Sequence, residues 1–96
     1  TPYEEELIED LKDPEEARLY LEAALASYEE DGDTKSLLLA LRDVAEAHGG
    51  VGALAKKTNT TRQHLYEILA SKHNPRIDTL LDILSGLGFR VQLATA

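Results

Sequence analysis

Four polar side chains, spaced as on the first two turns of one helix, have the chemistry that reads the edges of nucleic-acid bases. They are Arg62, Gln63, His64 and Glu67. An arginine there can donate two hydrogen bonds to guanine, and a glutamine can pair in a similar way with adenine. The N-terminal end of a helix lying in the major groove is where such side chains meet the bases. These four residues are the candidate base contacts, and they need a scaffold that holds their helix in place.

Residues 51–69 have the pattern of such a scaffold, two short helices joined by a tight turn. Ala55 is small enough for a close crossing of the two helices. Asn59, four residues later, tolerates the left-handed backbone that the turn requires. Three further apolar residues form a seam between the helices. The predicted core of this helix-turn-helix is Leu54, Ala55, Asn59, Leu65 and Ile68.

Basic and hydroxyl side chains around the second helix are candidate contacts to phosphate. They are Lys56, Lys57, Thr61, Tyr66, Lys72 and Arg76. Phosphate contacts set affinity and register rather than sequence choice. Tyr66 can instead help to fill the apolar seam, and Thr60 or Thr61 can cap the second helix. The alternative interpretation is that all of these are ordinary exposed residues of a helical bundle.

Helical signals run along most of the chain. Asp13-Pro14 is a typical helix start, Asp33 can cap a following helix, and Gly49-Gly50 and Gly88 are typical helix ends. Asn74-Pro75 marks a loop. We expect helices over residues 14–30, 34–48, 51–58, 61–70 and 78–87. Tyr3, Leu7, Ile8 and Leu11 also recur at helical spacing, so they belong either to a short helix or to a segment that is mobile without a partner.

Residues 89–93 alternate with a period of two, which predicts a β-strand. A lone strand cannot satisfy its own backbone hydrogen-bonding groups. The simplest remedy is pairing with the same strand of a second copy, which predicts a two-fold homodimer through Phe89, Val91 and Leu93. The alternative is a frayed tail whose Phe89 packs on the core.

Charge is divided unevenly along the chain. Residues 1–33 hold thirteen acidic and two basic residues, a net charge of −11, whereas residues 34–96 have a net charge of +3. Nucleic-acid binding depends on the local potential, so the overall charge of −8 does not exclude it. The acidic segment is either a solvated helix face or a surface for a partner.

Several function classes lack support in the sequence. The chain has no cysteine, and His48, His64 and His73 are not at metal-ligand spacing, so we expect no metal site and no cofactor. No catalytic residues can be assigned, because no carboxylate pair or Ser-His-acid arrangement is evident, and we do not expect an enzyme. No apolar run is long enough to span a membrane and no signal peptide is evident, so a cytoplasmic location is expected.

Residues 34–88 resemble a five-helix domain of the lambda-repressor type, the Xre-like group. The residues that carry this resemblance are Ala55, Asn59, Leu65 and the helix Leu80-Leu81 to Leu87-Gly88. The resemblance implies that Thr61, Arg62, Gln63, His64 and Glu67 face DNA. It also implies that Arg76 contacts the DNA backbone. Asn59 departs from the glycine that this group usually has in the turn.

A narrower resemblance covers the chain from about Tyr3 to Leu93. The order of motifs is similar to that of the addiction-module antidote proteins, HigA-like antitoxins of type II toxin–antitoxin pairs. These motifs are Tyr20-Leu21, Asp31-Gly32-Asp33, Ala40 to Ala45, Leu65-Tyr66, Asn74-Pro75-Arg76 and Asp78 to Leu81. The resemblance implies an autorepressor that binds operator DNA and neutralises a RelE/ParE-like toxin. Toxins of that class are typically basic, so the acidic residues 1–12 could cover one. Alternatively, they pack on a dimer mate or keep the chain soluble.

We therefore predict an all-α chain in three parts. Residues 1–33 form an acidic helical extension, residues 34–88 a helix-turn-helix DNA-binding domain, and residues 89–96 a C-terminal strand. The predicted function is that of an antitoxin. Two alternatives are a phage-type transcriptional regulator without a toxin, and a helical interaction module that has lost DNA binding.

Overall fold

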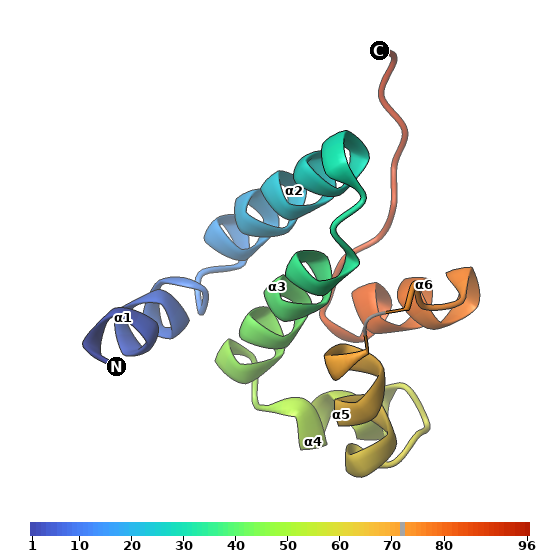
Figure 1. The fold of residues 1–96 in the computed structure, drawn as a ribbon. Coiled ribbons are helices and arrows are strands. Elements are labelled where there is room, and N and C mark those ends of the chain that lie inside the picture. The colour runs from blue at the N-terminus through green and yellow to red at the C-terminus, as the bar shows by residue number, and fades with distance from the viewer. Residues whose placement is uncertain (72) are drawn as a thin grey trace.

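Six α-helices make up the part of the chain that the computed structural model describes, residues 1–71 and 73–96 (Figure 1). This confirms the all-α class, and each predicted helix end lies within one residue of the observed one. The helices are α1 Pro2–Asp10, α2 Pro14–Asp31, α3 Thr34–Ala47, α4 Val51–Lys57, α5 Arg62–Ala70 and α6 Ile77–Gly86.

Capping side chains and prolines fix the starts of the first three helices. The carboxylate of Asp13 accepts a hydrogen bond from the Glu15 backbone N–H at 3.0 Å, and Pro14 occupies the first position of α2. Asp33 caps α3 in the same way, accepting from the Ser36 N–H at 3.1 Å. These bonds satisfy backbone donors that a helix start leaves without a partner. Helices α2 and α3 are thereby separated by a two-residue connection, and they run antiparallel beside each other (Figure 1).

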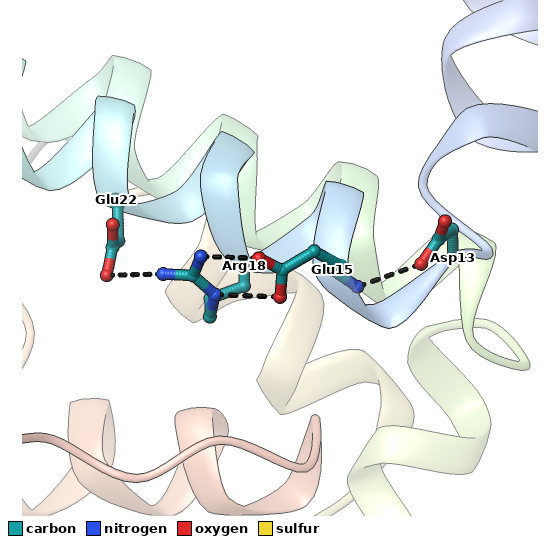
Figure 2. Close-up of polar contacts among 4 residues, drawn as sticks. All are labelled: Asp13, Glu15, Arg18 and Glu22. Carbon is teal, nitrogen blue, oxygen red and sulfur yellow. Dashed lines mark hydrogen bonds and ion pairs between the residues drawn. The ribbon is translucent and has the colours of Figure 1, made fainter.

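One of the two basic residues in the acidic third of the chain is neutralised within α2. The Arg18 guanidinium lies between the carboxylates of Glu15 and Glu22, with N–O distances of 2.5 and 3.0 Å (Figure 2). The hydrogen bond from Arg18 lowers the pKa of Glu15. Because the group is exposed, this cluster adds little to stability. Its consequence is electrostatic, since it leaves α2 with little free positive charge.

Helix α3 lies at the centre of the hydrophobic core. Helices α1, α2, α4 and α5 all pack against it, and α6 packs against α4. Half of its 14 residues are buried, namely Thr34, Leu37, Leu38, Ala40, Leu41, Val44 and Ala45. Helix α2 adds Ala17 and Leu21 to the same core, so the acidic third of the chain is packed onto the remainder.

Two long-range hydrogen bonds hold the N-terminal helices on α3. The His48 Nε2 atom lies 2.7 Å from the Leu11 carbonyl oxygen, and Leu11 is itself buried. The Tyr20 hydroxyl donates to the Asp43 carboxylate at 2.7 Å. The pKa of Tyr20 is raised above that of a free phenol, mainly because the side chain is partly buried and also because of this hydrogen bond. These contacts place α1 across the C-terminal half of α3.

A glycine allows α6 to approach α4 closely. A Cβ atom added at Gly86 would lie 2.6 Å from Leu54 Cδ1 and 3.3 Å from Thr58 Cγ2. Because Leu54 is buried in the core, it has little room to withdraw. Gly86 therefore belongs to the packing of α6, a role that its position inside a helix did not indicate in the sequence.

The structure differs from the sequence-based predictions at two places. Residues 34–88 hold four helices among their described residues, one fewer than the resemblance implied. Residues 89–96 form no strand in the single chain, because a strand needs a partner for its backbone groups. Instead Phe89 packs against the core, while Val91 and Leu93 are 56% and 96% exposed. Residues 89–96 are called the tail below.

Among the described residues, none of the helices combines the length and apolar character needed to cross a bilayer. The same residues bring no three acidic or histidine side chains together as a possible metal site.

Enlarging Ala55 should destabilise the fold. Its side chain is 2% exposed, so an Ala55→Leu variant must push apart the helices around it, at about 1–3 kcal/mol. The free energy of unfolding in urea measures the loss. Ala23→Leu, on the exposed side of α2, is the matched control and should change stability by less than about 0.5 kcal/mol. Equal stability of the two variants would contradict a close crossing at Ala55.

Candidate nucleic-acid interface

The turn between α4 and α5 is set by one residue in a left-handed backbone conformation. Asn59 has a φ of 56°, the only positive value at a non-glycine residue in the described part of the chain. The next N–H, of Thr60, bonds back to the Ala55 carbonyl at 3.0 Å, as in a Schellman helix end. The Thr58 hydroxyl donates to the Leu54 carbonyl at 3.1 Å. Together these bonds satisfy the carbonyl groups at the end of α4 and reverse the chain within four residues.

Thr61 then begins helix α5. Its hydroxyl accepts a hydrogen bond from the His64 N–H at 3.1 Å, and its backbone is extended. From this start, Leu65 and Leu69 point into the core, and both are buried. Ile68 is half-buried and packs against the same core. The periodicity of these apolar residues leaves the opposite side of the first turn in solvent.

The four candidate base contacts lie on that solvent side. Arg62, Gln63, His64 and Glu67 are all exposed. His64 Nδ1 is 3.8 Å from Glu67 Oε2, so the two side chains form an ion pair when the imidazole is protonated. The structure therefore brings together donors and acceptors of several kinds at the N-terminal end of one exposed helix.

The Tyr66 ring is in contact with the Arg62 side chain. The guanidinium carbons of Arg62 and Arg42 are each 5.4 Å from the centre of the Tyr66 ring, a cation–π distance. The Tyr66 hydroxyl also donates to the Glu46 carboxylate at 3.3 Å. Stacking on the ring restricts Arg62, a long and otherwise mobile side chain. Helix α3 thus supports the first residue of α5 through Arg42 and Glu46.

The candidate phosphate contacts lie on both sides of α5. Lys56 and Lys57 are exposed in the last turn of α4, and Thr61 is exposed at the start of α5. Arg76 is exposed at the start of α6, and its Nε lies 3.2 Å from an Asp78 carboxylate oxygen. This hydrogen bond lowers the pKa of Asp78. The last candidate, Lys72, lies outside the described residues.

Asn74 anchors the loop between α5 and α6. Its Oδ1 atom accepts a hydrogen bond from the Tyr28 hydroxyl at 3.1 Å and another from the Thr34 hydroxyl. The two donors belong to α2 and α3, so the loop that carries Arg76 is tied to the central helices. This anchoring role could not be inferred from the Asn74-Pro75 sequence, which indicates only a loop.

In a comparison with protein-family models, residues 4–95 match a family described as "Probable addiction module antidote protein". The chain belongs to the addiction-module antidote family. Membership indicates an antitoxin role, and an antidote implies a toxin partner of some kind. No curated protein and no solved structure matches the chain significantly.

Three residues near the candidate interface of this antidote chain were missed by the sequence analysis. They are Arg42 and Glu46, which contact Tyr66, and Gly52, where an added Cβ atom would lie 3.6 Å from Arg62 Cδ. Arg42 and Glu46 are one helical turn apart on α3. That spacing alone is a weak signal, because it is common to the exposed faces of most helices.

The backbone of Asn59 makes a stability prediction for the α4–α5 turn. Asn59→Val should lower the free energy of unfolding by about 1–2 kcal/mol, because a β-branched residue is strained in the left-handed region. Asn59→Gly should leave stability unchanged or slightly higher, since glycine adopts this conformation freely. Urea unfolding of the two variants tests this. Similar losses in both would show that the Asn59 side chain matters rather than its backbone.

Proposed function

We propose that the chain is the antitoxin of a type II toxin–antitoxin pair, that it binds its operator through a helix-turn-helix formed by α4 and α5, and that it represses its own operon. The observation that carries the DNA-binding part is the exposed N-terminal face of α5, which is held by a capped start and a tight turn. Family membership supports the antitoxin part. No catalytic role is proposed.

In the proposed complex, α5 enters the major groove with its first turn toward the bases. Arg62 donates to guanine and Gln63 pairs with adenine, while His64 and Glu67 contact neighbouring positions. Lys56, Lys57 and Arg76 neutralise phosphates on either side, and the Thr61 hydroxyl adds a further backbone contact. The Tyr66 hydroxyl donates to a phosphate in this complex by leaving Glu46. The ends of α4 and α6 that carry these cations are fixed relative to α5 by the Asn59 turn and by Asn74.

The division of charge fits this arrangement. The α4–α5 pair belongs to the mildly basic part of the chain, and the acidic helices α1 and α2 pack on α3 instead. In Figure 1, α2 runs alongside α3, whereas the α4–α5 pair lies beyond the C-terminal end of α3, so the acidic surface of α2 is set apart from the proposed DNA face. The protein can therefore approach DNA despite its overall negative charge, because local potential governs binding.

The proposed toxin partner is of the RelE/ParE type. Its gene is expected beside that of the antitoxin and should encode a short basic protein. A protein of this charge complements the net charge of −11 over residues 1–33.

Removal of the base-reading arginine should reduce specific binding. Arg62→Ala is expected to lose about 1–3 kcal/mol of binding free energy at the operator and to relax base choice at one position. Binding is measured on DNA from upstream of the chain's own gene and on a scrambled sequence, at low and moderate salt. An equal loss on both DNAs would contradict the role given to Arg62. The absence of specific binding at any salt would overturn the DNA-binding proposal.

A lysine in the proposed phosphate set should behave differently. Lys57→Ala is expected to weaken binding to both sequences alike and to reduce the slope of log affinity against log salt by about one. Lys12→Ala, in the link between α1 and α2, removes the same charge elsewhere and should weaken binding much less. If the two variants bind equally, Lys57 does not contact phosphate.

We also propose that the tail pairs with that of a second copy, giving a two-fold dimer whose two α5 helices read the two halves of one operator. Val91 and Leu93 are exposed, and the tail borders a groove formed with α2. A variant that ends at Arg90 keeps Phe89 in the core but lacks Val91 and Leu93, the two exposed pairing residues. Sedimentation should give a dimer for the full chain and a monomer for this variant. Equal masses would contradict pairing through the tail.

A further inference from the structure

A groove lies between α1 and α3 on the side where Tyr20 of α2 hydrogen-bonds to Asp43. Leu7 and Ile8 form part of its floor and are half-buried, and Leu7 packs against the core. Two large apolar side chains line it while remaining exposed, Tyr3 at 75% and Leu39 at 52%. We call this the α1–α3 groove. Its lining is Tyr3, Glu4, Leu7, Ile8, Tyr20, Leu39, Arg42, Asp43 and Glu46.

The α1–α3 groove has apolar side chains that stay exposed on both of its helices in the single chain. Helix α1 has no buried residue of its own, and α3 is the helix on which it packs. Leu39 is the exposed leucine of an otherwise largely buried run from Leu37 to Leu41. A leucine and a tyrosine left in water on facing helices gain free energy when a partner covers them, about 25 cal/mol for each Å² removed from water.

The charges at the rim define what can cover this surface. Glu4, Asp43 and Glu46 are the acidic groups of the groove, and Arg42 is its one basic group. The Arg42 guanidinium is stacked on Tyr66. Glu5, Glu6, Glu9 and Asp10 make the rest of α1 strongly acidic. The complementary occupant is a protein segment that presents an apolar side chain with lysine or arginine on either side.

We propose that the α1–α3 groove is the docking surface for the basic toxin, which inserts an apolar side chain between Tyr3 and Leu39 and pairs its cations with the acidic rim. This inference rests on the proposed antitoxin function and deepens it. Two other surfaces described above already have proposed occupants, since the α4–α5 face is assigned to DNA and the tail to a second copy. In this proposal the toxin contacts α3 as well as the acidic helix α1, because both helices line the groove.

A charge-matched pair of variants tests the groove. Leu39→Lys removes the apolar wall and adds a charge that repels a basic partner. Leu19→Lys makes the same change at a leucine of α2 that is 48% exposed and does not line the groove. The probe is the protein encoded beside the chain's own gene, titrated by calorimetry at moderate salt. Leu39→Lys should weaken binding at least tenfold, and Leu19→Lys should stay within about twofold of the unaltered chain.

Tyr3→Lys is the second groove variant, in case Leu39→Lys does not fold. Tyr3 is exposed and lies outside the core, so its replacement should leave thermal unfolding unchanged while weakening binding by a similar factor. If the unaltered chain binds the neighbouring protein and the groove variants bind as well as Leu19→Lys, the groove inference is overturned and the antitoxin function stands. If the unaltered chain does not bind that protein at any salt, toxin neutralisation fails and the groove inference falls with it.

Discussion

Burial of helix α3 is the constraint on which the rest of the structure depends. Seven of its residues are buried, so it can exist only when other helices surround it, and α1, α2, α4 and α5 do so. Some residues that this packing leaves exposed on α3 contact other parts of the molecule. Arg42 and Glu46 line the α1–α3 groove and also hold Tyr66 of α5. One central helix therefore supports both the proposed toxin surface and the proposed DNA surface.

Helices α3, α4 and α6 end with the same hydrogen-bonding pattern. At α3, α4 and α6, the N–H two residues beyond the C-cap bonds to a carbonyl five positions earlier, and the residue between has a positive φ. Glycine supplies that conformation at Gly49 and Gly88. Asn59 supplies it in the turn before α5, where an asparagine is among the more tolerant of the non-glycine residues. The orientation of α5 thus depends on local backbone geometry, and its depth in the fold depends on Leu65 and Leu69.

Sequence alone gave the helices and their ends, because caps, glycines and apolar periodicity act over a few neighbouring residues. It also indicated which side chains of α5 face solvent. It did not predict the stack of Arg62 and Arg42 on Tyr66, the anchoring of Asn74 by Tyr28 and Thr34, or the close approach at Gly86. Arg62 and Tyr66 are four positions apart on α5, but the other contacts join residues about 20 to 46 positions apart, so those follow from packing rather than from any local pattern. The alternation of residues in the tail is also a local pattern. A strand, however, needs a second strand to pair with, and no such strand is present among the described residues of the single chain.

Helix α1 differs from the other five in how little of it is buried, with Leu11 just beyond its end providing the main attachment. An element with so few buried groups opens at a lower free energy than the whole fold. We therefore expect the amide hydrogens of α1 to exchange with solvent well before those of α3, while α2 to α6 stay folded. A partner that binds only the form in which α1 is packed on α3 shifts this local equilibrium toward that form by mass action. The fraction of molecules with α1 attached would then depend on the partner's concentration, which couples the local stability of one helix to the abundance of a second protein.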